Sequence, residues 1–172
     1  MAPEPTRREP RRVLCRTPRM ARYETTIPSG RSAQDTFDYL ADFSTTEEWD
    51  PGVVHAERLD DGPIGPGARF RVVSRFLGRD VPLEYTVTAF EPGYRVSLRG
   101  ENGTTVSEDE ITVESDARGT RVHYDADLQL KGPGKLLDPA LKLVFKHVGD
   151  RAADGLRQAL ADEPSFRNMF LD

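Results

Sequence analysis

The chain has 172 residues, of which 37% are hydrophobic and 31% charged, and its formal net charge is −5. This length predicts one domain that can bury a sizeable core, and the 13 prolines and 14 glycines are too few for a low-complexity chain. A mean hydropathy of −0.60, with no apolar run near the roughly 20 residues of a spanning helix, argues against a membrane protein.

Charge is distributed unevenly along the chain. Residues 1–21 hold six arginines and two acidic residues, a net charge of +4, so the remaining chain carries −9. An acidic body is unsuited to the phosphate backbone, and we expect no nucleic-acid partner and no stable membrane insertion. The basic stretch has no aromatic residue and cannot build a core, so residues 1–20 are predicted to be a disordered basic leader.

Cysteine and histidine give no sign of a disulfide or a metal site. The single cysteine, Cys15, excludes an intramolecular disulfide and is typical of a reducing cytoplasm, where we expect the protein to reside. His55, His123 and His147 stand alone in the sequence, without HxH or HExxH spacing. We therefore expect neither a metal nor a cofactor.

The first predicted elements are one strand and two short helices. Residues 22–28 alternate and are rich in β-formers, which predicts a strand. Ser32 can cap a helix and Asp35 favours its first turn, so a short amphipathic helix is expected over 32–42. A second, shorter helix is expected over 44–49.

Strands dominate the middle of the chain, and a long helix follows. Alternating segments predict six further strands, at 53–59, 68–77, 81–90, 94–101, 104–114 and 119–131. Asn102–Gly103 lies between two of them and is a strong hairpin signal. A helix of about 25 residues is expected over 135–161, with Asp138–Pro139 suited to a cap and first helical position.

This order predicts an antiparallel sheet bent around the final helix. Strands joined by short turns pair antiparallel, and the apolar face of the sheet must be covered. The C-terminal helix is the only predicted element long enough to cover it. Between sheet and helix lies a gap that is either packed with side chains or holds a ligand.

Several loose motifs, in this order and spacing, resemble one superfamily. They are Phe37–Asp42, Glu48–Val54, Gly65–Gly67, Glu91–Pro92, Gly119–Val122, Gly149–Ala152 and Gly155–Leu156. The chain resembles the START-like (SRPBCC) superfamily over about residues 20–162, and within it the bacterial polyketide cyclase/dehydrase-like branch. The resemblance implies an α+β helix-grip fold, β-α-α-β6-α, with a curved seven-stranded antiparallel sheet. The domain is placed at 21–162 and a C-terminal tail at 163–172.

Strand parity and helix periodicity suggest which side chains face the gap. The predicted ligand-binding residues are Trp49, Phe70, Ser74, Phe76, Leu83, Tyr85, Val122, Tyr124, Leu141, Phe145 and Val148. The same parity turns Asp109 inward, where burial would raise its pKa and suit it to acid–base chemistry beside Tyr124. Alternatively, Asp109 is solvated on the convex face beside Glu108 and Glu110, and the tyrosines only line the core or a ligand. Trp49 is expected at the mouth of the gap, as a packing anchor or a ligand lid.

Three functions remain open at this stage. The first is binding of a hydrophobic or aromatic small molecule such as a lipid, polyketide or isoprenoid. The second is a polyketide cyclase, aromatase or dehydratase that uses Asp109 and Tyr124 as catalytic groups. The third is a protein-interaction domain with a filled core. A fold hosts many functions, so the resemblance does not choose among them.

Overall fold

The computed structural model describes residues 21–131 and 139–161, the last helix with its side chains from residue 143 onward. The strands are β1 (Ala21–Ser29), β2 (Val53–Arg58), β3 (Arg69–Phe76), β4 (Arg79–Glu91), β5 (Arg95–Glu101), β6 (Thr105–Asp116) and β7 (Gly119–Leu130). The helical elements are α1 (Ala33–Ala41), the 3-10 turn η1 (Phe43–Thr45), α2 (Thr46–Trp49) and α3 (Pro139–Ala161). The predicted leader at 1–20 and tail at 163–172 lie outside the described residues.

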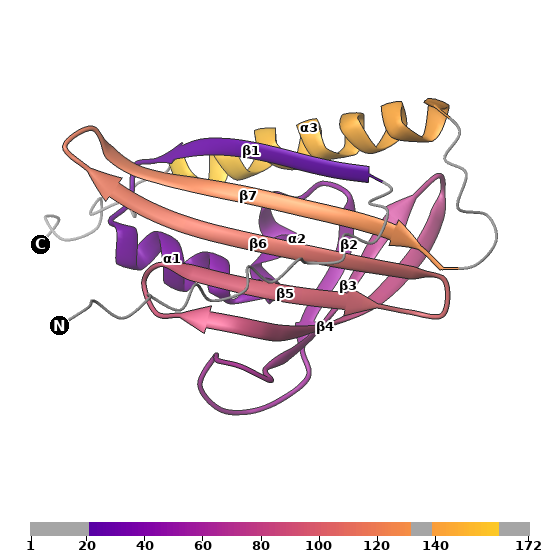
Figure 1. Ribbon diagram of the computed structural model, residues 1–172, viewed down its shortest axis with the longest axis horizontal. Helices are drawn as coiled ribbons and strands as arrows, with labels where there is room; N and C mark the ends of the chain where they lie inside the picture. The colour runs from indigo at the N-terminus through magenta and orange to yellow at the C-terminus, as the bar shows by residue number, and fades with distance from the viewer. Residues whose placement is uncertain (1–20, 132–138, 162–172) are drawn as a thin grey trace, which may run out of the picture.

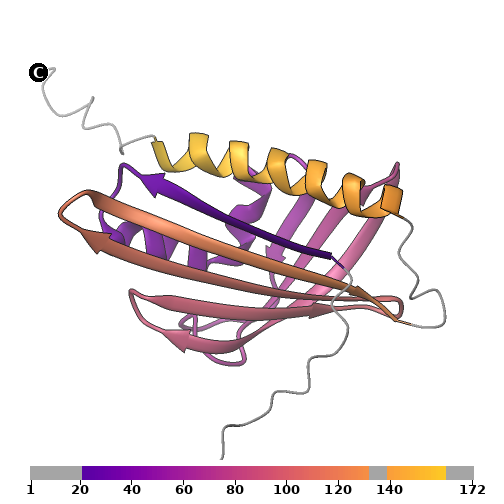
Figure 2. The ribbon, with the colours of Figure 1, turned by 45° about the horizontal axis from the view of Figure 1, so that its top comes forward.

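The seven strands form one antiparallel sheet that curves around α3. Their order is β1-β7-β6-β5-β4-β3-β2, so β1 joins the sheet beside the last strand. Register shifts interrupt the pairing at Val53/His55 and at Val87/Ala89, and such irregularities bend a sheet. Figures 1 and 2 show the strands passing below α3, with α1 at one end, and Figure 1 shows α2 nearer the middle, beside β2. The predicted helix-grip fold is confirmed.

The short helix α1 forms where its cap and apolar face predict it. The Ser32 hydroxyl oxygen accepts a hydrogen bond from the Asp35 backbone amide at 3.1 Å, which satisfies one of the free donors at the helix start. Phe37 and Leu40 are each 1% exposed and pack into the core. This helix therefore fills one end of the hollow beneath the sheet.

Two glycines let α3 approach its neighbours closely. A Cβ at Gly155 would collide with the Trp49 backbone carbonyl, so only glycine allows α3 to cross the end of α2 at this separation. A Cβ at Gly149 would overlap the ring of Tyr23 on β1. The first contact fixes α3 against α2 and the second fixes it over the edge strand β1, although glycine within a helix costs about 1 kcal/mol.

The two faces of the sheet differ in chemistry. The convex face carries cross-strand ion pairs, among them Arg99 with Glu108 at 2.7 Å and Arg71 with Glu57 at 3.2 Å. His123 also lies there and its Nδ1 is 2.8 Å from the Thr26 hydroxyl, as expected for a surface residue. The concave face buries the apolar side chains, so alternation along the strands places the core between sheet and helices.

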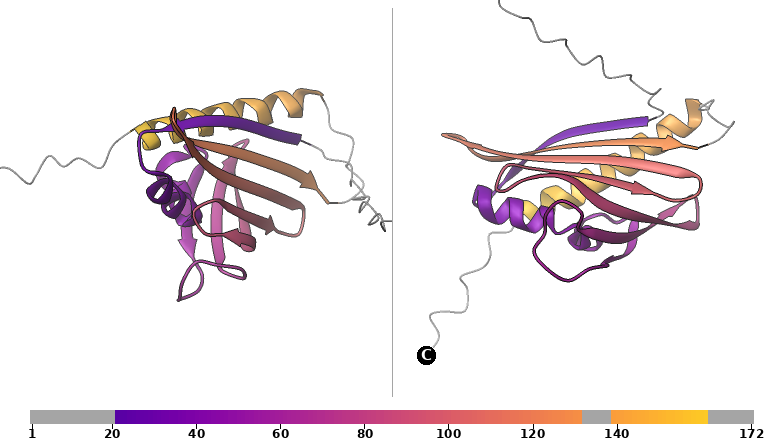
Figure 3. Two further views of the ribbon diagram at one scale, coloured as in Figure 1. Left: turned by 60° about the vertical axis from the view of Figure 1, so that its left-hand side comes forward. Right: turned by 60° about the horizontal axis from the view of Figure 1, so that its bottom comes forward.

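Part of the core is packed beside α1. Phe37 packs against Phe90 there, with ring centroids 5.4 Å apart, and Val96 and Ile111 are fully buried in the same core. Figure 3 shows the strands and α3 extending beyond α1 toward the opposite end. None of the described helices is long and apolar enough to cross a membrane.

Candidate functional site

A cavity of about 840 Å³ lies between the sheet and α3. Its walls come from β1, β3, β4, β6 and β7, from η1, α2 and the start of β2, and from α3 between Phe145 and Leu156. This volume falls within the range of about 300–1,000 Å³ that is typical of small-molecule sites. The cavity occupies the part of the hollow that α1 does not fill.

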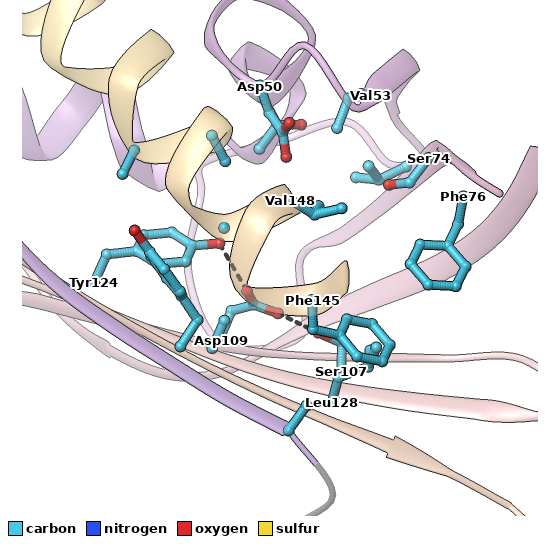
Figure 4. Close-up of a pocket in the computed structure, with 18 of the residues that line it drawn as sticks. Asp50, Val53, Ser74, Phe76, Ser107, Asp109, Tyr124, Leu128, Phe145 and Val148 are labelled. Atoms are coloured by element: carbon cyan, nitrogen blue, oxygen red, sulfur yellow. Dashed lines mark hydrogen bonds between the residues drawn. The ribbon is translucent and has the colours of Figure 1, made fainter. Parts of the chain in front are cut away.

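Most of the cavity wall is apolar. Figure 4 shows Phe76, Val148 and Leu128 pointing into it from β3, α3 and β7. The rings of Phe76 and Phe145 stack with centroids 5.1 Å apart and planes inclined by 13°. This pair joins the end of β3 to α3 and forms one apolar edge of the cavity.

One polar cluster interrupts the apolar wall. Asp109 is only 5% exposed, the Tyr124 hydroxyl donates to its Oδ1 at 2.7 Å, and the Ser107 hydroxyl donates to its Oδ2 at 2.8 Å (Figure 4). Ser107 and Asp109 are two residues apart on β6 and so share a face, while Tyr124 lies on the adjacent β7 opposite Ile111. Both carboxylate oxygens are therefore held by hydroxyl donors.

The electrostatics of the cluster follow from burial. Burial raises the pKa of Asp109, and hydrogen bonds from Tyr124, Ser107 and Tyr85 oppose that rise. Burial and the nearby Asp109 carboxylate raise the pKa of Tyr85 and of Tyr124 well above the usual value, so both phenols stay protonated. The Tyr85 ring lies across Gly100 on β5, where a Cβ would come within 2.6 Å of the ring. The cluster can accept or donate a proton only through Asp109.

A second carboxylate, Asp50, was missed by the sequence analysis as a site residue. It follows α2 and points into the cavity (Figure 4), and its Oδ1 accepts a hydrogen bond from the Gly52 amide at 2.7 Å. Burial raises the pKa of Asp50, while that hydrogen bond and Arg151 lower it. In the sequence, Asp50 falls only within the Glu48–Val54 motif.

Trp49 is a wall residue rather than a residue at the mouth. It is 5% exposed, and its ring meets that of Tyr124 edge-on at 6.0 Å. The expected position at the mouth is therefore wrong, because the crossing of α3 at Gly155 covers the end of α2. Its indole Nε1 is buried without a hydrogen-bond partner among the described residues.

The predicted ligand-contact positions divide into three groups. Eight line the cavity: Trp49, Ser74, Phe76, Leu83, Tyr85, Tyr124, Phe145 and Val148. Phe70 and Val122 do not line it, so their prediction is corrected: both are 0% exposed in the packed core, Phe70 against the ring of Phe43. The side chain of Leu141 lies outside the described part of α3. Asp109 is inward, and the alternative of a solvated Asp109 is wrong.

The cavity rim is charged and internally paired. On β1, Arg22 Nε donates to Asp125 at 2.8 Å. On α3, Lys146 donates to Asp150 at 2.7 Å, and the Tyr23 hydroxyl donates to the same carboxylate at 3.2 Å. Within residues 21–131 and 139–161 no group of three or more His, Cys, Asp or Glu side chains could hold a metal ion.

Comparison with known proteins identifies the family of this chain. Residues 20–161 match the family described as "Polyketide cyclase / dehydrase and lipid transport". No curated protein sequence matches the chain.

Solved structures share the fold at low sequence identity. A START superfamily protein from Mycobacterium smegmatis has 14% identity and a TM-score of 0.64, over 81% of this chain and 94% of the other. The Zhui aromatase/cyclase from Streptomyces sp. R1128 has 17% identity and a TM-score of 0.63, over 81% and 90%. The protein TTHA0849 from Thermus thermophilus has 19% identity and a TM-score of 0.65, over 81% and 95%.

Proposed function

The chain belongs to the polyketide cyclase/dehydrase and lipid transport family, and from that premise we propose that it binds a hydrophobic or aromatic small molecule between the sheet and α3. The observation that carries the proposal is the cavity of about 840 Å³, with apolar walls and one convergent polar cluster at Asp109. Apolar walls supply affinity and a few placed polar groups orient the ligand, which is the usual design of such sites. A lipid, polyketide or isoprenoid fits this chemistry.

The only tryptophan of the chain provides the first test. Trp49 is a cavity-wall residue, so a ligand in the cavity should quench or shift its fluorescence. We would titrate the full chain with N-phenyl-1-naphthylamine, a neutral apolar probe, and expect a saturable change. The proposal fails if neither the tryptophan signal nor the probe signal saturates.

A cavity-filling variant locates the binding. Ala126 on β7 lines the cavity, and Ala126→Phe should weaken probe binding about tenfold, or about 1.4 kcal/mol, because the added ring takes up space that the probe needs. Ala117→Phe, in the exposed turn between β6 and β7, is the matched control and should leave the affinity unchanged. Equal affinities of the two variants would place the probe elsewhere.

The alternative is a polyketide cyclase, aromatase or dehydratase. The observation that favours it is a pair of buried carboxylates, Asp50 and Asp109, in the same cavity as Tyr124. In that reaction Asp109 would remove or return a proton of a polyketone, and the Tyr124 phenol would orient a substrate carbonyl. Asp109→Asn and Tyr124→Phe separate the two functions: lost turnover with retained ligand affinity supports an enzyme, and unchanged turnover of an accepted substrate contradicts these catalytic roles.

A protein-interaction domain with a filled core is disfavoured. That function would leave the space between sheet and helix packed, whereas the described residues surround an open volume.

A further inference from the structure

The charges of the cavity are unevenly arranged between its rim and its interior. The described lining residues include two bases and four acids, Arg22 and Lys146 against Glu24, Asp50, Asp109 and Asp150. Both bases are at the exposed rim and already paired, Arg22 with Asp125 and Lys146 with Asp150. Among the described lining residues, no cation is left to neutralise the interior.

The two interior acids lack ionic partners. Asp109 is held by hydroxyl groups, and Asp50 by the Gly52 amide through Oδ1. Neither forms an ion pair with any side chain of the described residues; Arg151 influences Asp50 only at a distance and is itself exposed. The second oxygen of Asp50 makes no hydrogen bond within the described part of the chain, and the Asp50 side chain points into the cavity (Figure 4).

This arrangement has a direct consequence for the charge of a ligand. A carboxylate or phosphate in the cavity would be desolvated beside two acidic side chains without a cation, and burying an unpaired charge is costly. A hydroxyl or amine, in contrast, can donate to the free oxygen of Asp50. Hydrogen bonds from a donor to an ionised carboxylate are the stronger kind.

We infer that the ligand is a non-anionic molecule whose apolar body ends in a hydroxyl or amine donor directed at Asp50, and that the two interior acids make the cavity reject carboxylates. The inference rests on the proposed binding function and narrows it. A hydroxylated aromatic polyketide or an isoprenoid alcohol meets these requirements, and a free fatty acid does not. The apolar end of the ligand would lie toward the Phe76–Phe145 pair.

A matched ligand series tests the charge preference on the unmodified full chain. Naphthalene, 2-naphthol and 2-naphthoate share one apolar body and differ in a single substituent, and the last is ionised near neutral pH because carboxyl pKa values lie near 4. Isothermal titration calorimetry should give 2-naphthol an affinity at least tenfold higher than 2-naphthoate, with naphthalene between them. Equal or tighter binding of 2-naphthoate would overturn the inference.

Variants assign the preference to the interior acids. Asp50→Asn and Asp109→Asn should each reduce the difference in affinity between 2-naphthol and 2-naphthoate to about threefold or less. Glu108→Gln removes the same charge from the convex face next to Asp109, where Glu108 pairs with Arg99, and should leave the difference unchanged. An equal reduction in Glu108→Gln would mean that total charge sets the preference, which contradicts the inference; Asp50→Asn decides alone if Asp109→Asn does not fold.

The failures of function and of ligand class are distinguishable. If all three naphthalenes, like the neutral probe, fail to bind, the proposed function falls and this inference with it. If they bind without regard to charge, the binding function stands and only the ligand class is wrong.

Discussion

Replacing Tyr124 by phenylalanine tests the polar cluster at the cavity wall. The change keeps the ring that packs against Trp49 but removes the hydroxyl that donates to Asp109 Oδ1 at 2.7 Å. Hydrogen bonds to charged groups contribute about 1.5–3 kcal/mol, and a buried acceptor left unpaired incurs its desolvation cost. We expect the free energy of unfolding to fall by about 2 kcal/mol at neutral pH.

The loss of stability in Tyr124→Phe should depend on pH in a defined direction. Burial places the pKa of Asp109 above its unfolded value, and the Tyr124 bond counteracts that rise. The folded state therefore binds more protons, and stability falls as pH rises through the folded pKa. Loss of the hydroxyl raises the pKa of Asp109 in the folded state further. The free energy of unfolding that Tyr124→Phe loses should therefore increase with pH. Below the unfolded pKa, near 4, that loss should be only about 1 kcal/mol.

Urea denaturation at neutral and at acidic pH measures both effects. Tyr94→Phe is the matched control, because Tyr94 is 45% exposed and its hydroxyl loss should stay within about 0.5 kcal/mol. If Tyr124→Phe costs no more than Tyr94→Phe at neutral pH, or if its loss of stability is independent of pH, the bond does not hold an ionised Asp109 and the reasoning is refuted.

Three further predictions concern the helix seam, the cavity edge and the second carboxylate. Gly149→Ala should lower the Tm although alanine is the better helix former by about 1 kcal/mol, because its Cβ would overlap the Tyr23 ring; in a Tyr23→Ala background the same change should raise the Tm, and stabilisation in both backgrounds would contradict the packing. Phe145→Ala removes the stacking with Phe76 and should speed release of bound 2-naphthol several-fold in stopped-flow mixing; an unchanged rate would show that this edge does not control access. Asp50→Asn should raise the Tm at neutral pH, because burial raises the pKa of Asp50 and stability is lost as pH rises through the folded pKa. That gain should vanish below about pH 4, and a lower Tm at neutral pH would count against a desolvated carboxylate.

The order and type of the elements could be predicted because local signals agreed with the final packing. Ser32 caps α1 as its position before an amphipathic segment predicts. The Asn102–Gly103 pair joins β5 to β6, and the Asn102 side chain accepts hydrogen bonds from the Thr104 and Thr105 amides at 2.9 Å. Local hydrogen bonds and strand alternation were thus sufficient to predict the order and type of most elements.

The face of Asp109 depended on strand regularity. In the sequence, Asp109 between two glutamates fitted either face, because a single bulge reverses the alternation. β6 pairs without a register shift, with β7 over its whole length and with β5 from Val106 to Thr112, so Asp109 shares the inward face of Ile111. Burial of the carboxylate follows from that uninterrupted pairing.

Alternation along a strand could not predict which inward-facing residues meet the packed core and which line the cavity. Phe70 and Val122 were assigned to the correct face, yet both lie where the core is packed and not where the cavity is open. Periodicity reports which side of the sheet a residue faces, whereas the cavity depends on how far α1 fills the hollow.

Asp50 and Trp49 illustrate the role of tertiary contacts. Both lie at the end of the short α2, where neither helix nor strand periodicity applies. The close crossing of α3 at Gly155 against the Trp49 carbonyl brings them to the cavity wall. The sequence indicated Trp49 as a ligand contact, but the place of Asp50 in the site follows only when the long helix is placed over the sheet.

Native mass spectrometry of the purified full chain shows whether the cavity holds a small molecule. We expect a species heavier than the 19.3 kDa polypeptide by the mass of one small apolar molecule that is released on denaturation. If the chain is purified without such a molecule, we expect it to take up one 2-naphthol. A bare chain that takes up no 2-naphthol at saturating concentration would contradict a ligand-binding cavity.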